Sequence, residues 1–330
     1  MRPPIQMLDL GCLISKSPTH TCAVSVSAAG WEIQHPISGG WADGGTIRCV
    51  TAKILITGHQ GQLGRALGEA CRERGIPADG RDLDTLDIRD RNAVRQWITA
   101  ARPTVVVNCA AMTAVDRCET EIGAAMEVNG TAVGHVASAC NEVGSTLVQL
   151  STDYVFRGNG EGAYSEDDPT DPVTVYGRSK LLGEQSARAA ANHLIVRTAW
   201  LFGIGGGNFV EAIRGQIEGG AVALRVVDDQ RGCPTSSDDL AVALLDLLDV
   251  GARGVVHVVN SGAVTWHGFA EEIARRLGAE VSVEAISTDQ TARPARRPAN
   301  SVLATDRLQG LLGRTLPPWQ DGLARYLAAS

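Results

Sequence analysis

Three glycines stand three residues apart between an apolar run and a helical stretch: Gly58, Gly61 and Gly64. Glycine permits a tight turn and a close backbone approach to a ligand, and the helix that follows offers free N–H groups and the positive end of its dipole. The run 53–56 predicts a first strand, and residues 62–74 predict a first helix. This unit predicts a dinucleotide-binding fold, although such turns also serve packing alone. The expected cofactor contacts are Gly58, Gln60, Gly61, Gln62, Leu63 and Gly64.

Short apolar runs then alternate with helical stretches. Strands are expected at 105–107, 146–150 and 194–196, and helices at 121–143 and around residues 176–180. Such alternation is typical of a parallel sheet covered by helices. After about residue 200 the pattern is mixed, with strands expected at 221–227 and 254–259 and helices near 238–249 and 267–277. We therefore predict an α/β fold, a Rossmann-type doubly wound parallel sheet (51–199) with a smaller C-terminal substrate-binding region (200–330) partly interleaved with the sheet.

Residues 1–50 differ from the rest of the chain. They contain four prolines and six glycines without a sustained period, and the pattern changes abruptly at Lys53. We interpret them as a disordered extension. The chain has 27 arginines and three lysines, a bias that suggests a GC-rich coding sequence in which a GTG start codon is plausible. If translation begins at Val50, residues 1–49 are not translated in the native protein.

The composition excludes several classes of function. The 330 residues are 44% hydrophobic, enough for a substantial core, and the net charge of −7 provides no diffuse basic surface for nucleic acid or an anionic membrane. Eight cysteines lack any Cys-x-x-Cys spacing, and the seven histidines show no ligand spacing. No apolar run is long enough to span a membrane, and the N-terminus lacks a signal-peptide pattern. We expect a cytoplasmic protein with reduced thiols, without structural zinc and without assigned metal ligands, while Mg²⁺ dependence stays open.

Tyr176 and Lys180 stand four residues apart in a chain with only four tyrosines and three lysines. Positions i and i+4 share a helix face, and an ammonium beside a phenol is expected to lower the pKa of the phenol. Such a tyrosine can transfer a proton near neutral pH. The alternative is a surface pair in which the lysine alkyl chain packs on the ring. Together with the Gly-x-x-Gly-x-x-Gly spacing, Tyr-x-x-x-Lys resembles the extended short-chain dehydrogenases.

An acidic residue is expected near the adenosine ribose, or an arginine near its 2′-phosphate, about twenty positions after the glycines. Asp79, Arg81 and Asp82 fall in this window. We expect Arg81 to contact the phosphate of NADPH while neighbouring carboxylates keep NADH acceptable. The choice between the two cofactors stays open.

Six further segments resemble one branch of this superfamily, the dTDP-4-dehydrorhamnose reductases: 107–116, 150–156, 176–184, 197–203, 227–235 and 297–303. The resemblance runs from about residue 53 to the C-terminus. It implies catalytic roles for Thr152, Tyr176 and Lys180. It also implies that Asp87, Ile88, Ala110, Ala111 and Thr113 lie beside NADPH or NADH, together with Tyr176 and Lys180, and that Thr113, Thr152, Tyr154 and Trp200 lie near the substrate.

The run Thr152-Asp153-Tyr154 separates reduction from dehydration. The related 4,6-dehydratases follow the threonine with Asp-Glu, and without the second carboxylate an elimination has no evident proton shuttle. The expected partner is a dTDP-linked 4-keto-6-deoxyhexose, and a homodimer is left open.

Each of these features also has a structural alternative. Asp87 or Thr152 could be a cap, Trp200 a core aromatic, and Asp228-Asp229 a solvated turn. Two rival functions remain: reduction of another nucleotide-linked keto sugar, and a non-catalytic subunit resembling the regulatory subunit of methionine adenosyltransferase.

Overall fold

The computed structural model describes residues 53–329, so the interpretation of residues 1–50 lies outside the described part of the chain. A six-stranded sheet has the order β2-β1-β3-β4-β5-β10, and every neighbouring pair is parallel. Its strands are β1 Ile54–Thr57, β2 Ala78–Arg81, β3 Val105–Asn108, β4 Thr146–Thr152, β5 His193–Thr198 and β10 Gly254–His257. The order reverses between β1 and β3, and open α/β sheets bind ligands outside the carboxyl ends of strands at such a point.

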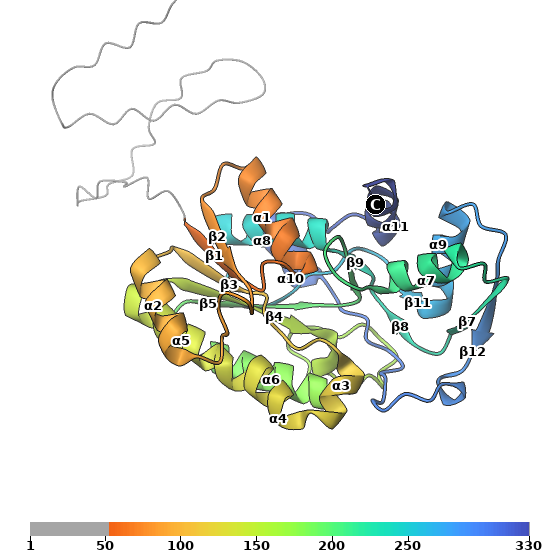
Figure 1. The fold of residues 1–330 in the computed structure, drawn as a ribbon, viewed down its shortest axis with the longest axis horizontal. Coiled ribbons are helices and arrows are strands. Elements are labelled where there is room, and N and C mark those ends of the chain that lie inside the picture. The colour runs from red at the N-terminus through yellow and green to blue at the C-terminus, as the bar shows by residue number, and fades with distance from the viewer. Residues whose placement is uncertain (1–52, 330) are drawn as a thin grey trace, which may run out of the picture. The chain divides into compact units, whose positions relative to one another are not determined.

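Helices cover both faces of the sheet (Figure 1). One layer contains α1 Gln62–Glu73, α8 Ser237–Asp249 and α10 Asp306–Leu312, and the other contains α2 Arg91–Ala101, α5 Ala132–Val143 and α6 Val175–Ala187. Ile54 and Ile56 pack into the first layer, whereas Leu55 packs into the second. Successive side chains of a strand point to opposite faces, which is why these strands read as continuous apolar runs.

The helix expected at 121–143 is interrupted. The chain forms α3 Val115–Thr120, α4 Ile122–Met126, a π-helical turn over Glu127–Thr131 and then α5. The turn carries the buried Asn129, whose side chain accepts from the Met112 amide and donates to the Met112 carbonyl and to Ser179. Because these bonds hold the loop after β3 against α6, tertiary contacts rather than helical periodicity decide this segment.

Residues after β5 have two roles. β10 and α8 join the sheet and its helical layer, while α7 Phe209–Glu218, α9 Trp266–Arg276 and α11 Trp319–Ala329 surround a second core with β7 Ala223–Val227 and β12 Ser282–Ile286, which pair in parallel. Short strands connect the parts: β6 Leu201–Phe202 with β9 Thr235–Ser236, and β8 Arg231–Gly232 with β11 Val264–Thr265. Two 3₁₀ turns span Asp153–Val155 and Thr288–Gln290. This arrangement supports a C-terminal region interleaved with the sheet.

None of the helices within residues 53–329 is long and apolar enough to cross a membrane.

Candidate active site

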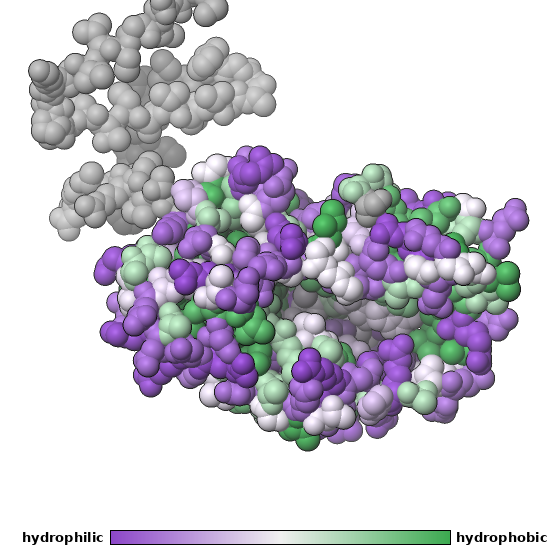
Figure 2. Space-filling view, viewed as in Figure 1, coloured by the Kyte–Doolittle hydropathy of each residue, from purple (hydrophilic) through white to green (hydrophobic). Residues whose placement is uncertain are grey.

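A cleft of about 1050 Å³ opens at the carboxyl ends of β1, β3 and β4. Figure 2 shows the hollow on this face. The cleft brings together every site residue expected from the sequence except Arg81: the glycine-rich turn, Asp87 and Ile88, Ala110, Ala111 and Thr113, Thr152 and Tyr154, Tyr176 and Lys180, and Trp200. Residues from six segments far apart in the sequence therefore meet at one site.

The glycine-rich turn is shaped for a close ligand approach. Gly58 has a φ of +62°, and a β-carbon there would lie 2.7 Å from the Ala110 nitrogen. A β-carbon at Gly64 would lie 2.3 Å from the Gly58 carbonyl oxygen. Helix α1 has Gly61 at its N-cap position and no side-chain cap, whereas Asp90 caps α2, Thr174 caps α6 and Ser236 caps α8. The first N–H groups of α1 are thus left for a ligand, and this arrangement fits a dinucleotide pyrophosphate.

The end of β2 separates two residues that the sequence placed together. Arg81 does not line the cleft, because its guanidinium lies over the Trp97 ring, 5.4 Å from the ring centroid. Its neighbour Asp82 does line the cleft, and the Asp82 carboxylate accepts from the Gln60 amide at 2.9 Å. The sequence placed both residues in the ribose window.

Asp87 lines the cleft and is not the cap of the following helix. Asp90 has that role, since it accepts from the amides of Asn92 and Ala93. Asp87 instead pairs with Arg89, and the hydrogen bond from this guanidinium lowers the pKa of the Asp87 carboxyl. Asp228 and Asp229 are also not simply solvated, because they accept from Thr265 and Thr288.

Tyr176 is held one residue inside the N-terminus of α6. Burial raises the pKa of its phenol, and a hydrogen bond with Thr152 acts in the opposite direction. The expected lowering of this pKa by Lys180 is therefore wrong for the cleft without ligands, where burial dominates. A raised pKa keeps the phenol protonated at neutral pH, which is the form a proton donor needs.

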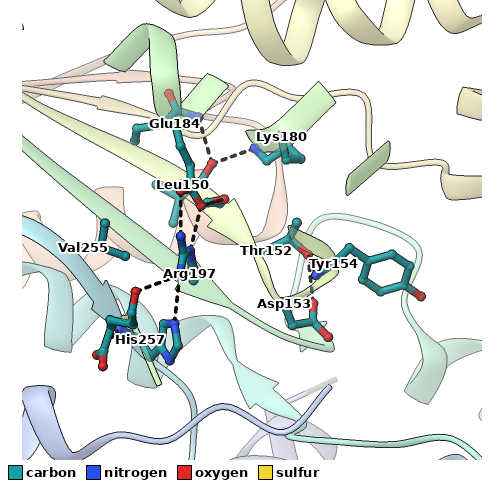
Figure 3. Close-up of polar contacts among 12 residues, drawn as sticks. Leu150, Thr152, Asp153, Tyr154, Lys180, Glu184, Arg197, Val255 and His257 are labelled. Carbon is teal, nitrogen blue, oxygen red and sulfur yellow. Dashed lines mark hydrogen bonds and ion pairs between the residues drawn. The ribbon is translucent and has the colours of Figure 1, made fainter. Parts of the chain in front are cut away.

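Lys180 is a buried cation. Its Nζ donates to the Leu150 carbonyl at 2.6 Å, as Figure 3 shows. Burial lowers the pKa of Lys180 from 10.5 to about 8, while the carboxylate of Glu184 raises it. Lys180 therefore loses its charge near the upper end of the physiological pH range.

A buried ion pair lies behind β4. Glu184 accepts from Arg197 at 2.8 and 2.9 Å and from the Ser151 hydroxyl at 2.7 Å. His257 lies 3.5 Å from Arg197, and burial, followed by the charge of Arg197, lowers the pKa of its ring to about 4 (Figure 3). Separating the partners of such a pair would leave an uncompensated buried charge, which is unfavourable. Because Glu184 also accepts from Ser151, the network fixes the strand that carries Ser151 and Thr152.

Asp153 is a cleft residue that the sequence did not single out for a role. The Thr152 hydroxyl donates to one oxygen of its carboxylate at 2.8 Å, and Oδ2 has no partner among the described residues. Burial raises the pKa of Asp153 to about 6, although the hydroxyls of Ser301 and Thr152 act in the opposite direction. Thr152 also accepts from the Tyr154 amide at 3.2 Å, so it both caps the turn and faces the cleft.

Asp153→Asn is expected to stabilise the fold more at pH 8 than at pH 4. Because the folded-state pKa of about 6 lies above the ordinary value of 3.8, the contribution of the carboxyl to stability is present below pH 3.8 and is lost as the pH rises through 6. The asparagine does not titrate, so the gain in free energy of unfolding should be larger at pH 8 by about 2 kcal/mol. Urea unfolding of both proteins at the two pH values measures it, with the exposed Asp289→Asn as control. An equal effect at both pH values would contradict the raised pKa.

Trp266 was also missed. It begins α9 and lines the cleft beside Trp200, with the two ring centroids 3.5 Å apart. In the sequence, Trp266 stands directly before the helix expected near 267–277, where an aromatic residue is expected to pack in the core. That position was the only signal for it.

A doubly wound parallel sheet with a glycine-rich turn after β1 and a Tyr-x-x-x-Lys helix at the same cleft is the architecture of the extended short-chain dehydrogenases and reductases. A family model described as "RmlD substrate binding domain" matches residues 52–330. The chain belongs to this family, that of the dTDP-4-dehydrorhamnose reductases.

Relatives and solved structures agree. A dTDP-4-dehydrorhamnose reductase of Streptomyces griseus is 43% identical over 283 residues, which cover 83% of this chain and 93% of the relative. A probable dTDP-4,6-dihydroxy-2-methyloxan-3-one 4-ketoreductase of Streptomyces antibioticus is 40% identical over 274 residues, covering 82% and 92%. The crystal structure of the Bacillus anthracis dTDP-4-dehydrorhamnose reductase in complex with NADP is 35% identical, with a TM-score of 0.81 and coverage of 84% and 99%.

Proposed function

We propose that this chain reduces dTDP-4-dehydro-L-rhamnose to dTDP-L-rhamnose with NAD(P)H, a step of nucleotide-sugar synthesis for surface polysaccharide. The observation that carries the proposal is that Tyr176, Thr152 and the glycine-rich turn meet in one cleft. Family membership and the NADP complex of a relative support the cofactor and the substrate class. The turn and the uncapped start of α1 would hold the pyrophosphate.

Bound NAD(P)H supplies the hydride that the ketone carbon accepts. Tyr176 delivers a proton to the ketone oxygen, on which negative charge develops, and its raised pKa keeps that proton available at neutral pH. Thr152 turns its hydroxyl from Asp153 toward the same oxygen and stabilises the developing charge. Lys180 also lines the cleft, and its positive charge would hold the cofactor ribose and support the phenol.

Position 154 favours reduction over dehydration. Burial raises the pKa of the Tyr154 phenol, and its ring packs edge-on against Tyr176 with centroids 5.6 Å apart. A neutral phenol cannot act as the second carboxylate of an elimination. Tyr154 instead provides a wall of the substrate pocket.

The purified chain should oxidise NADPH when dTDP-4-dehydrorhamnose is added, as followed by the loss of NADPH absorbance. A panel of other nucleotide-linked 4-keto sugars separates the proposal from the activity suggested by the name of the Streptomyces antibioticus relative. Turnover with one of those sugars only would overturn the choice of substrate. Cofactor binding without turnover of any sugar would favour a non-catalytic subunit.

Asp82→Asn is expected to raise kcat/KM for NADPH relative to that for NADH, because it removes a carboxylate that lines the cleft after β2. Relief of repulsion with the 2′-phosphate should contribute about 1 kcal/mol, or about fivefold in the ratio of kcat/KM values. Arg81→Ala is the control, since the Arg81 guanidinium lies over Trp97. A loss of NADPH preference in Arg81→Ala, with none of the expected gain in Asp82→Asn, would restore the original interpretation of Arg81.

A further inference from the structure

The two tryptophans of the cleft form a stacked pair. Trp200 lies between β5 and β6, and Trp266 begins α9, yet their ring centroids are 3.5 Å apart and the planes differ by 4°. Both side chains are half-buried and both line the cleft. Aromatic pairs generally prefer offset or edge-on geometries at longer centroid distances. A face-to-face pair this close therefore needs support from its surroundings.

The backbone of Trp200 is under strain. Its φ is +45°, and among residues 53–329 only Arg102 is another non-glycine residue with positive φ. Arg102 terminates α2, where a left-handed residue is common, but Trp200 follows a strand. Such strain is unfavourable and persists only where neighbouring structure holds it. The Thr235 amide does so in part, since it donates to the Trp200 carbonyl at 3.2 Å.

Gly232 leaves room for the Trp200 ring. A β-carbon at this position would lie 2.4 Å from Cε2 of the indole, so any other residue displaces the ring. β8 and β11 pair Gly232 with Val264, two residues before Trp266. Thr265 then caps α9 through the Gly268 amide and donates to Asp228 at 2.6 Å. Segment 228–232 and the start of α9 therefore contact each other and together hold the two indoles in place.

We propose that Trp266, together with Gly232, is a positioning residue that fixes the Trp200 indole in the cleft and thereby sets the affinity for the sugar nucleotide. The proposal rests on the proposed function and on the place near the substrate that the family resemblance implies for Trp200, which lines the cleft. The Trp200 ring is held in place by its backbone conformation, by the stack on Trp266 and by the close approach of Gly232. It therefore presents a preorganised surface, and a ligand that binds to such a surface orders fewer groups on binding. Trp266 acts through Trp200 and takes no part in proton transfer.

The test compares Trp266→Ala, Trp266→Phe and Gly232→Ala in the full chain. Loss of an aromatic pair corresponds to about three- to tenfold in affinity. Trp266→Ala should raise the KM of the keto sugar, and the Kd of the product dTDP-L-rhamnose, by about this factor while changing kcat and the NADPH Kd less than twofold. Trp266→Phe retains the stack and should restore most of the affinity. Gly232→Ala displaces Trp200 without touching the chemistry of Trp266 and should raise the same two constants.

Trp319→Phe is the matched control, because Trp319 belongs to the same apolar cluster but does not line the cleft. It should leave the KM unchanged even if the melting temperature falls. An unchanged dTDP-L-rhamnose Kd in Trp266→Ala, an equal loss of NADPH affinity, or no recovery in Trp266→Phe would each overturn the inference. Calorimetric binding of dTDP-L-rhamnose decides it independently of turnover, so failure of the proposed reaction is distinguished from failure of this assignment.

Discussion

Tyr176→Phe is expected to reduce turnover by about 10³–10⁴-fold while leaving the fold and dinucleotide binding intact. General acid catalysis contributes about 10²–10⁴-fold, and the phenol also provides a hydrogen bond to the developing alkoxide, so the loss should lie in the upper part of this range. The phenylalanine retains the ring that packs against Tyr154. Single-turnover measurements of NADPH oxidation, with calorimetric binding of NADPH in parallel, separate chemistry from binding.

Tyr164→Phe is the matched control. The Tyr164 hydroxyl accepts from the amides of Gly158 and Gly160, both at 3.1 Å, and does not line the cleft. Tyr164→Phe should lower stability more than it lowers turnover. If Tyr176→Phe retained more than about a tenth of the wild-type rate in a chemistry-limited assay, another group would be the principal proton donor.

Lys180→Ala is expected to weaken NADPH binding as well as the chemical step, because in the proposed mechanism one ammonium serves both the ribose and the phenol. A hydrogen bond to a charged group contributes about 1.5–3 kcal/mol, which corresponds to a rise in the NADPH Kd of about ten- to a hundredfold. Burial lowers the pKa of Lys180 to about 8, so the ammonium is present below this pH and is lost above it. The wild-type kcat/KM should therefore fall as the pH rises through about 8, and the variant should lack this limb.

Lys53, the other lysine in the described part of the chain, provides the control, since Lys53→Ala removes an ammonium outside the cleft. It should keep the wild-type pH profile. A basic limb that persists unchanged in Lys180→Ala would assign that limb to another group, and unchanged NADPH binding would remove Lys180 from the cofactor site.

Much of the fold follows from local pattern. The run 53–56 and residues 62–74 predicted β1 and α1, because a buried parallel strand is continuously apolar and an amphipathic helix repeats every 3.6 residues. The weakest predictions concerned segments whose form depends on long-range contacts. The π-helical turn around Asn129 is fixed by bonds to Met112 and Ser179, and nothing in its local sequence indicates them.

The candidate site divides in the same way. Motifs in the order of a known family predicted which side chains line the cleft, and Thr152, Tyr176 and Lys180 do meet there. Arg81 is the expected residue that does not line the cleft, since two adjacent residues at a strand end point in different directions and the guanidinium packs on Trp97. Trp266 was missed because its place in the cleft depends on the pairing of β8 with β11.

The sequence by itself determined the class of fold and the family, and it pointed to the residues that we propose carry the chemistry, because these depend on short motifs and on the periodicity of apolar residues. Only the tertiary structure decided their electrostatic state. Burial raises the pKa of Tyr176 and Asp153 and lowers that of Lys180, and burial is produced by segments far apart in the chain that pack around one cleft. For the same reason, the strained backbone of Trp200 and its stack on Trp266 exist only once the chain has folded.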